Sequence, residues 1–324
     1  MITFVAGNPA ADRVYEVEVV RPGAIHRPHA SRALPGGKGI NAARAAHLLG
    51  ADSHVLSILG GHTGRWIEDR LREEGIGGTF AWADVETRTC VSIASSGTET
   101  GSGADPGFLT GFYERSEPIG ADKWAELEAA LRPLLARSEL LCLSGSVISG
   151  APLDGYRRLA EQANRAGVPV AIDSHGPELR EALHAGPALI KVNAEEAAEA
   201  LEERCPDQDL LKWAAHAAAR LQHSVPRNRL SVVTCGTSGM ALASARVLLV
   251  GRLDQVGSFP VGSGDAVLGC MAIEMCAGAA EAELLALGLG AGAANAEVPG
   301  PGLLDPSRVQ ALADQSLIEA IRVS

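Results

Sequence analysis

Aromatic residues are scarce in this 324-residue chain, at 4% of the sequence, whereas glycine occurs 37 times. We therefore expect many glycines to serve tight turns and close approaches to ligands rather than packing. Long hydrophobic runs are also missing, because the longest, residues 266–280, is interrupted by Glu274 and is too short to span a bilayer. The amino-terminal residues lack the basic start and apolar run of a signal peptide. We expect a cytoplasmic protein.

Basic residues and paired cysteines are scarce as well. The chain carries 28 Lys and Arg against 39 Asp and Glu, for a net charge of −11, which makes it a poor binder of nucleic acid or an anionic membrane. Any anion that it binds must be met by a local site. The six cysteines form no C-x-x-C pair, so neither a zinc site nor a disulfide framework is indicated. We expect small core residues in a reducing compartment.

Strand-length apolar runs alternate with helical patterns along most of the chain. The strands are expected at residues 2–6, 54–58, 140–143, 169–172, 189–192 and 230–234, and the helices at 41–49, 64–74, 123–136, 154–166 and 210–222. This repetition predicts an α/β fold with a mainly parallel sheet covered on both faces. Ligands of such sheets bind beyond the carboxyl ends of the strands.

Residues 14–34 and 80–113 break this alternation. The first segment carries Pro, His and Arg with β-type alternation, and the second is rich in Thr, Ser and Gly. Neither has a helical period, so we expect them to form a small β lid on a single domain spanning residues 1–324. Two long surface loops are the alternative.

A glycine-rich segment, Gly-Gly-Lys-Gly-Ile-Asn at 36–41, precedes an apolar helix. A P-loop needs a Gly five residues before its Gly-Lys pair and a Ser or Thr after it, but Arg32 and Gly39 stand there. What remains is a turn that lets backbone approach a ligand, with Lys38 and Asn41 on one face near the positive end of the helix. A polar ligand such as an anion fits there, and a simple helix cap is the alternative.

A second small-residue segment, Gly-Ser-Gly-Asp at 262–265, runs directly into an apolar helix. Backbone N–H groups at such a helix start can bind an anion. Phosphoryl transfer to an alcohol requires donors for the charge and a base for the hydroxyl proton, and Asp265 beside those donors could be that base. Asp265 could instead only cap the helix.

Two further segments are less specific. Asn193 and Glu196 lie three residues apart after a strand, which suits the outer shell of a hydrated Mg²⁺, or simply a solvated helix start. Thr234, Gly236 and Gly239 end another strand, where a nucleotide could lie close to backbone; a hairpin is the alternative.

Other catalytic and cofactor motifs are absent. Gly288, Gly290 and Gly292 follow a helical stretch with the wrong spacing for a dinucleotide fingerprint, which argues against a Rossmann dehydrogenase. No H-E-x-x-H motif occurs, and no Gly-x-Ser-x-Gly occurs in a strand–turn–helix context. Metalloprotease and serine hydrolase functions are therefore disfavoured.

Taken together, segments 36–41 and 262–265 resemble the ribokinase-like PfkB family of sugar kinases, and the resemblance covers nearly the whole chain. It implies a ribokinase-like three-layer sandwich with a mainly parallel central sheet and a small β lid. Asn-Pro-Ala-Ala-Asp at 8–12 and Thr-Arg at 87–88 are similar to the branch that acts on phosphorylated ketohexoses, the 1-phosphofructokinases and tagatose-6-phosphate kinases.

The resemblance implies ATP-dependent phosphorylation of a primary hydroxyl of a ketohexose monophosphate, either fructose 1-phosphate or tagatose 6-phosphate. ATP and Mg²⁺ are the implied cofactors, with a monovalent cation as a further candidate. It also implies a homodimer formed through the lid, whose outer face would carry Val91, Ile93 and Val19. The alternatives are a kinase for an unphosphorylated sugar or nucleoside, and a non-catalytic sugar-phosphate-binding protein.

By the same resemblance, Asp265 is the implied base and the N–H groups of Gly262, Ser263 and Gly264 form an anion hole. The implied substrate-binding residues are Asp12, Gly36, Gly37, Lys38, Asn41, Arg88, Arg27 and Ser144. The implied nucleotide-side residues are Lys191, Asn193, Thr234, Gly236, Gly239 and Asn295, and the implied metal-side residues are Glu196 and Asp173.

The chain departs from the family pattern at three places. Val192 replaces a usual Pro, and residues 147–150 lack the Pro usual after Ser-Gly-Ser, which should alter turn rigidity without removing a functional side chain. Residues 101–110 carry Asp105-Pro106 and Phe108 where the family often has a short Gly-Pro turn. Substrate choice is the property that this last departure affects.

Overall fold

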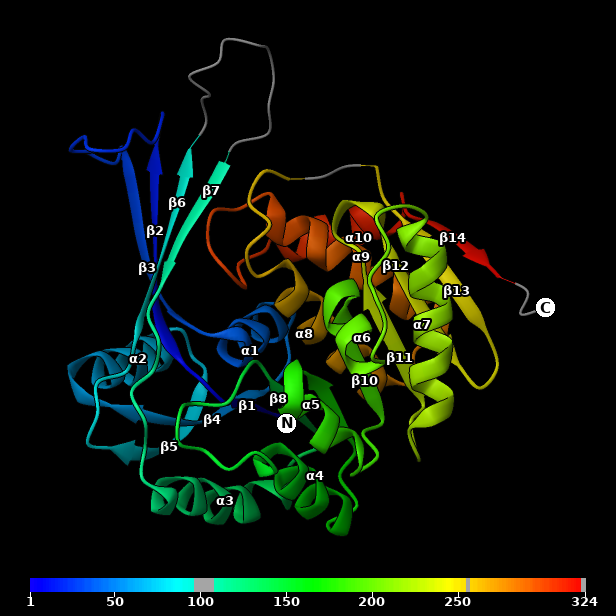
Figure 1. The fold of residues 1–324 in the computed structure, drawn as a ribbon, viewed down its shortest axis with the longest axis horizontal. Coiled ribbons are helices and arrows are strands. Elements are labelled where there is room, and N and C mark those ends of the chain that lie inside the picture. The colour runs from blue at the N-terminus through cyan, green and yellow to red at the C-terminus, as the bar shows by residue number, and fades with distance from the viewer. Residues whose placement is uncertain (96–107, 255–256, 322–324) are drawn as a thin grey trace.

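A ten-stranded sheet forms the centre of the molecule (Figure 1). The computed structural model describes residues 1–95, 108–254 and 257–321. Along the sheet the order is β14-β13-β12-β11-β10-β9-β8-β1-β4-β5. The parallel strands are β1 (Ile2–Ala6), β4 (Ser53–Gly60), β5 (Gly77–Ala83), β8 (Leu140–Ser144), β9 (Val170–Asp173), β10 (Leu189–Asn193) and β11 (Leu230–Thr234). The antiparallel edge consists of β12 (Met240–Ser244), β13 (Leu248–Arg252) and β14 (Leu317–Ala320).

Helices cover both faces of this sheet. One layer consists of α3 (Ala121–Leu135), α4 (Gly155–Arg165), α5 (Gly176–Leu183), α6 (Ala194–Ala200) and α7 (Leu210–Ser224). The other consists of α1 (Lys38–Leu48), α2 (Gly61–Glu73), α8 (Ser263–Ala277) and α9 (Glu281–Ala296), with α10 (Pro306–Ala313) packed on α9. The predicted α/β sandwich of three layers with a mainly parallel sheet is confirmed.

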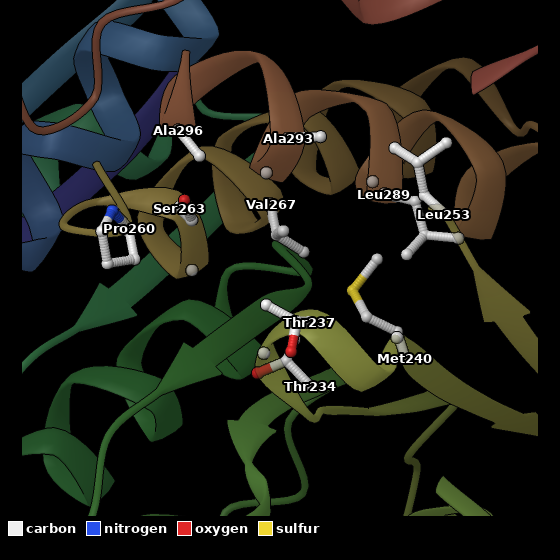
Figure 2. A pocket seen from close by; sticks show the side chains of 15 residues that line it. Thr234, Thr237, Met240, Leu253, Pro260, Ser263, Val267, Leu289, Ala293 and Ala296 are labelled. Atoms are coloured by element: carbon white, nitrogen blue, oxygen red, sulfur yellow. The ribbon is translucent and has the colours of Figure 1, made fainter. Parts of the chain in front are cut away.

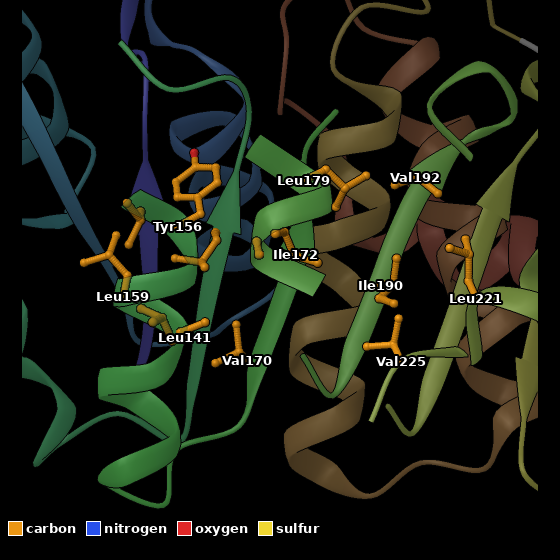
Figure 3. Packing of buried hydrophobic residues seen from close by; sticks show 14 of the residues in the cluster. Leu141, Tyr156, Leu159, Val170, Ile172, Leu179, Ile190, Val192, Leu221 and Val225 are labelled. Carbon is orange, nitrogen blue, oxygen red and sulfur yellow. The ribbon is translucent and has the colours of Figure 1, made fainter. Parts of the chain in front are cut away.

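The period of two along each strand creates the two cores. Val5 faces one layer and its neighbour Phe4 the other, and Ile190 and Leu189 divide in the same way. Both neighbours are apolar because a parallel sheet is buried on both faces. Figure 3 shows the first of these cores, where Ile190 packs near Val225 between β10 and α7.

A second, four-stranded sheet projects from the body beside α1 and α2 (Figure 1). Its order is β3-β2-β6-β7, with β2 (Ala10–Val17), β3 (Ala30–Gly36), β6 (Thr89–Ser95) and β7 (Phe108–Tyr113). We call this sheet the lid. It forms from the two segments that break the α/β pattern, rather than two surface loops, but their bounds differ from the expected ones.

The first lid segment begins at Ala10 rather than at residue 14, because β2 pairs with β3 from Ala10 to Glu16. The second begins later than expected, since residues 80–83 belong to β5 and pair with β4 in the main sheet. Most of the atypical segment 101–110 lies outside the described residues. Among the helices that the structure describes, none is long and apolar enough to cross a membrane.

Candidate active site

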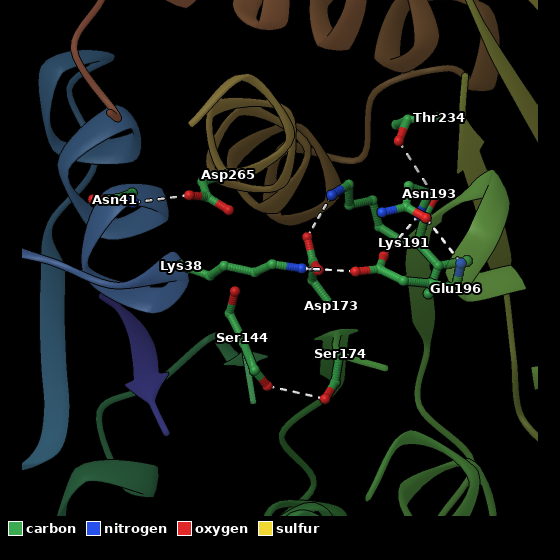
Figure 4. Close-up of polar contacts among 12 residues, drawn as sticks. Lys38, Asn41, Ser144, Asp173, Ser174, Lys191, Asn193, Glu196, Thr234 and Asp265 are labelled. Carbon is green, nitrogen blue, oxygen red and sulfur yellow. Dashed lines mark hydrogen bonds and ion pairs between the residues drawn. The ribbon is translucent and has the colours of Figure 1, made fainter. Parts of the chain in front are cut away.

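The carboxyl ends of the central parallel strands meet at one edge of the sheet, where the first turn of α8 faces them (Figure 4). Ser144 ends β8, Asp173 ends β9, Asn193 ends β10 and Thr234 ends β11. Side chains separated by more than a hundred residues in the sequence are thereby brought within hydrogen-bond distance.

The loop before α8 has the geometry expected of an anion site. Gly262 is the N-cap residue and has φ 85°, a left-handed conformation that glycine adopts without strain. The N–H of Ser263 donates to Pro260 O at 3.2 Å. The first N–H groups of an α-helix have no acceptor within the helix. The backbone N–H groups of Gly264 and Asp265 are therefore available to a ligand. Of the predicted anion hole at Gly262, Ser263 and Gly264, the N–H of Ser263 is therefore already engaged, and the hole itself stays a prediction.

Asp265 lies in the first turn of α8 and makes no cap hydrogen bond there. Its Oδ2 accepts from Asn41 Nδ2 at 2.9 Å, and its side chain points into the space between α1 and the strand ends (Figure 4). Burial, with a smaller effect from the nearby Asp173, raises the pKa of Asp265 to about 7. A carboxyl group with this pKa can accept a proton near neutral pH.

Two lysines and two carboxylates form a compact network beside Asp265. Lys191 donates to Asp173 Oδ2, and Lys38 Nζ lies 3.2 Å from Asp173 Oδ1 and 2.8 Å from Glu196 Oε1. Burial raises the pKa of Asp173, but the two ammonium groups outweigh it and hold the pKa below its usual range. Burial lowers the pKa of Lys38, but the surrounding carboxylates outweigh it and raise the pKa overall. The ammonium charge of Lys38 is thus secured before any ligand binds.

Asn193 and Glu196 form a reciprocal capping box at the start of α6. Asn193 Oδ1 accepts from Glu196 N, and Glu196 Oε2 accepts from Asn193 N, both at 2.8 Å. The prediction that this pair lies at a helix start is therefore confirmed. Glu196 is also bound by Lys38. No group of three or more His, Cys, Asp or Glu gathers as a preformed metal site within the described ranges.

A polar pocket of about 430 Å³ lies between the lid and the strand ends. Three buried polar atoms in or beside it, Asn8 Oδ1, Arg88 Nε and Ser144 Oγ, have no hydrogen-bond partner in the part of the chain that is described. Burial raises the pKa of Asp12 to about 6, against the positive charges of Arg44 and Arg88. Many of the predicted site residues line this pocket: Asp12, Gly37, Lys38, Asn41, Arg88, Lys191, Asn193, Glu196, Gly262, Gly264 and Asp265.

An apolar pocket of about 260 Å³ lies on the other side of the loop before α8 (Figure 2). Met240, Leu253, Val267 and Leu289 supply its apolar wall. Thr234, Gly236, Gly239, Ser263 and Gly264 line it as well. Gly236 and Gly239 flank the turn that joins β11 to β12, so both the hairpin and the pocket interpretations apply to this segment. Gly264 lines both pockets, which therefore meet at residues 260–264, the segment that we call the anion loop.

Four predicted residues lie in positions other than the expected ones. Arg27 is exposed between β2 and β3 and is not part of either lining within this chain. Asn295 is fully buried and is absent from both pocket linings; it donates to Val261 O at 2.9 Å and accepts from Gly302 N at 2.8 Å. It braces the loop before α8. Both carboxylate oxygens of Asp173 are bound by lysines, and Gly36 lies behind Asp12, where a Cβ would come within 2.0 Å of Oδ2.

The structure adds residues that the sequence analysis did not single out. Asn8 and His175 follow β1 and β9, so the rule that ligands bind at carboxyl ends of strands could have found them. Ser92 and Tyr113 come from β6 and β7, and their hydroxyls lie 3.2 Å apart. No sequence pattern predicts that these two hydroxyl groups come together. Arg44 is buried in α1, where a charge in an apolar helical run was a visible but unused signal.

The arrangement suits transfer of an anionic group between two ligands. An apolar pocket and a polar pocket meet at backbone donors, a carboxylate that can accept a proton, and two lysines that carry charge for an anion. Phosphoryl transfer uses these components, because its catalysis consists of positioning and electrostatic stabilisation.

Known proteins are similar to this chain over most of its length. It is 30% identical over 283 residues to a 1-phosphofructokinase of Xanthomonas campestris pv. campestris, which covers 85% of this chain and 84% of that protein. In fold it matches phosphofructokinase-2 from Escherichia coli, solved with potassium (TM-score 0.84, 24% identity, 97% and 98% of the two chains). It also matches a Thermotoga maritima protein described as a possible 1-phosphofructokinase (TM-score 0.87, 20% identity, 99% of each chain).

The family model for "pfkB family carbohydrate kinase" matches residues 6–308. This range contains the lid, the lysine–carboxylate network and Asp265. The chain therefore belongs to the pfkB family of carbohydrate kinases.

Proposed function

We propose that this kinase transfers the γ-phosphoryl group of ATP to a primary hydroxyl of a ketohexose monophosphate. The observation that carries the proposal is the position of Asp265, whose raised pKa and Asn41 contact place a proton acceptor where the two pockets meet. The 1-phosphofructokinase from Xanthomonas is the relative that favours a phosphorylated ketohexose.

In this proposal the nucleotide base enters the apolar pocket, and its phosphates reach the first turn of α8. The N–H groups of Gly264 and Asp265 bind the transferring phosphoryl group, because charge builds on its oxygens during transfer. Lys191 adds positive charge there, since a Cβ on Gly264 would lie 2.9 Å from Lys191 Nζ. Asp265 accepts the hydroxyl proton as the new O–P bond forms and the bond to ADP breaks.

Mg²⁺ is proposed to bind with the nucleotide phosphates, whose negative charge it neutralises when bound. Mg²⁺ keeps several waters and needs only one or two protein carboxylates. Glu196, at 12% side-chain exposure, is the better ligand, because Asp173 is at 0% and each of its oxygens is bound by a lysine, whereas Glu196 is bound by one lysine and one backbone N–H. We therefore assign Asp173 to positioning Lys38 and Lys191.

The sugar phosphate is proposed to bind in the polar pocket. Asp12 binds sugar hydroxyls, and Arg88, with its buried Nε free of a partner among the described residues, contacts the existing phosphate. Lys38 attracts the phosphate by its charge and not by a direct hydrogen bond, because its ammonium group is already bound to Asp173 and Glu196.

The test is ADP release measured with ATP, Mg²⁺ and a panel containing fructose 1-phosphate, fructose 6-phosphate, tagatose 6-phosphate, free ketohexoses and nucleosides. We expect turnover on a ketohexose phosphate to exceed turnover on the free sugars. Faster turnover on a free sugar or nucleoside would replace the proposal with that kinase, and binding without turnover would indicate a non-catalytic protein. Repeating the panel in K⁺ and in Na⁺ tests the predicted monovalent cation.

We further propose a homodimer formed through the outer face of the lid. Cys90 and Ser92 are buried toward the pocket, whereas Val91 and Ile93 are partly exposed on the opposite face beside the exposed Phe112. Pairing two lids would remove this apolar surface from water. Val19, expected on this face, lies beyond the end of β2. Sedimentation as a monomer at micromolar concentration would refute the dimer and leave the kinase proposal intact.

A further inference from the structure

Arg44 occupies an unusual place for a charged side chain. It lies in α1, three residues after Asn41, and is 2% exposed. A guanidinium stays charged in proteins and is rarely buried unless its donors are satisfied. Nothing in the proposed chemistry has yet used it.

Every donor of this guanidinium has an acceptor. A guanidinium has five N–H groups. Nε and Nη2 contact the two oxygens of Glu74 at 2.8 and 3.3 Å. Nη2 also donates to Pro35 O at 2.7 Å. Nη1 donates to Pro301 O at 3.3 Å and to Asn41 Oδ1 at 3.5 Å.

These acceptors belong to separate segments around the site, whose relative positions must be kept. Pro35 lies near the end of β3, where the lid joins α1. The 301–302 turn packs on the anion loop, since a Cβ on Gly262 would come within 2.6 Å of Pro301 Cα. Asn41 in turn donates to Asp265. A single side chain therefore joins the end of β3 at the base of the lid, which we call the lid hinge, the turn that packs on the anion loop, and Asn41, which donates to Asp265.

Arg44 also lies near Asp12, because Pro35, whose carbonyl accepts from Nη2, pairs between β3 and β2 with Ala11, the chain neighbour of Asp12. Burial raises the pKa of Asp12, and the charge of Arg44 is the largest influence that opposes this rise. The other charged or titratable groups facing Asp12 are Arg88, before β6, and the Cys90 thiol on β6. Without the charge of Arg44, the pKa of Asp12 would rise further, and more of Asp12 would be protonated near neutral pH.

We propose that Arg44 is a positioning residue with two separable actions, an inference that rests on the proposed kinase function. Its planar fork fixes Asn41, and through it Asp265, relative to the anion loop and the lid hinge. Its charge favours the ionised form of Asp12, which binds the sugar hydroxyls. Loss of the fork should therefore lower kcat, and loss of the charge should raise KM for the sugar phosphate.

Two variants separate these actions. Arg44→Lys keeps the charge but loses the fork. The double variant Arg44→Met with Glu74→Gln loses both and leaves no unpaired buried carboxylate, which would otherwise destabilise the fold. The matched control is Arg308→Met, which removes a similar fork on Glu297, with contacts of 3.0 and 2.7 Å, from outside both pocket linings.

The measurements are the thermal midpoint, kcat, and KM for the sugar phosphate between pH 5.5 and 8. Each KM is divided by the wild-type value at the same pH, so that titration of the substrate phosphate cancels. We expect Arg44→Lys to lower kcat by roughly 10- to 100-fold, since small misplacements of reacting groups have effects of this order, with a KM ratio independent of pH. We expect the double variant to show a similar fall in kcat. Its KM ratio should rise as pH falls, through a pKa shifted upward by roughly one unit.

Folded variants with wild-type kcat would overturn the action of the fork. A double variant whose KM ratio is flat with pH would overturn the action of the charge. If the double variant does not fold, Arg44→Lys still decides the first action, and Arg44→Gln with Glu74→Gln decides the second. A wild-type protein with no turnover on any sugar phosphate would overturn the proposed function and this inference with it, whereas an active wild type with unaffected variants would overturn this inference alone.

Discussion

The two pockets that meet at α8 are built from opposite kinds of residues. The apolar pocket, which we propose for the nucleotide, is walled by Met240, Leu253, Val267 and Leu289, with hydroxyl groups from two threonines and Ser263. The polar pocket, which we propose for the sugar phosphate, contains lysines, an arginine and several carboxylates, together with lid strands. The first can recognise a ligand chiefly by shape and apolar contact, and the second by charge and hydrogen bonds.

The difference also concerns the state of each pocket before ligands bind. Apolar walls need no partner, but a buried charge does, and here each lysine is already paired with Asp173 or Glu196. The two ammonium groups are thereby kept charged at the strand ends, within a protein of net charge −11. Substitutions on the two sides should therefore differ in what they change, and the following predictions test that difference.

The largest effect is expected where the pockets meet. Asp265→Asn should lower kcat by about 10²- to 10⁴-fold or more, because a positioned base contributes at least that order. The amide retains an acceptor for Asn41, so the local geometry is kept. Steady-state ADP release checks the rate, and titration with a fluorescent ATP analogue should show nearly unchanged nucleotide affinity. Near-normal turnover would remove Asp265 from the role of base.

A loss confined to the sugar side is expected from Arg88→Ala. One charge-assisted contact is worth roughly 1.5 to 3 kcal/mol, which corresponds to about 10- to 150-fold in kcat/KM for the sugar phosphate. Any residual use of the free sugar should fall much less. The control is Arg115→Ala, an exposed arginine in the chain segment that follows the lid.

Arg88 also donates to Asn8 O and Glu114 O, both at 3.2 Å, so it could act only by bracing the lid. Equal losses on the phosphorylated and the free sugar would support that structural role and contradict phosphate recognition.

The dependence of activity on pH should follow the ionisation of Asp265. The pKa of Asp265 is raised to about 7 by burial, and a base works only when ionised. Activity should therefore increase as pH rises through about 7, and kcat/KM should fall about tenfold per pH unit on the acid side. Protonation of Asp12, whose pKa is about 6, should steepen the fall at lower pH. A profile that is flat from pH 5.5 to 8 would contradict both assignments.

The smallest effect is expected on the nucleotide side. Ala293→Leu places a larger side chain in the apolar pocket, and overpacking of this kind should raise KM for ATP by about tenfold. KM for the sugar phosphate should stay near its wild-type value. Ala282→Leu, on an exposed position of the same helix, is the matched control. A comparable rise in both KM values would mean that the pockets are not independent.

The sequence predicted the elements better than the contacts between them. Apart from β5, the strands of the parallel sheet were found because strands buried on both faces form continuous apolar runs, as at residues 189–192. β13 and β14 were not predicted, and β12 was considered only as part of a hairpin, since these strands are placed by antiparallel pairing rather than by a strand–helix pattern. The start of the second lid segment was wrong because residues 80–83 alternate in the same way in β5 as they would in a lid.

The candidate site shows the same limit. Motifs brought Lys38, Asn41, Lys191, Glu196 and Asp265 to one place, as expected from their positions after strands and before helices. No motif could show that both oxygens of Asp173 would be bound by lysines, or that Asn295 would brace a loop. Those facts depend on side-chain directions across more than one element, which spacing in a sequence does not encode.

The Asn41–Asp265 hydrogen bond joins residues 224 positions apart in the chain. During synthesis on the ribosome, the lid, both lysines and their carboxylates are therefore made well before the residue that completes the catalytic centre. Contacts of such long range form late, because the chain must first close a large loop. A nascent or truncated chain that ends before α8 lacks both Asp265 and the helix that packs on α1 and α9. Premature termination should accordingly yield inactive fragments rather than enzymes of reduced activity.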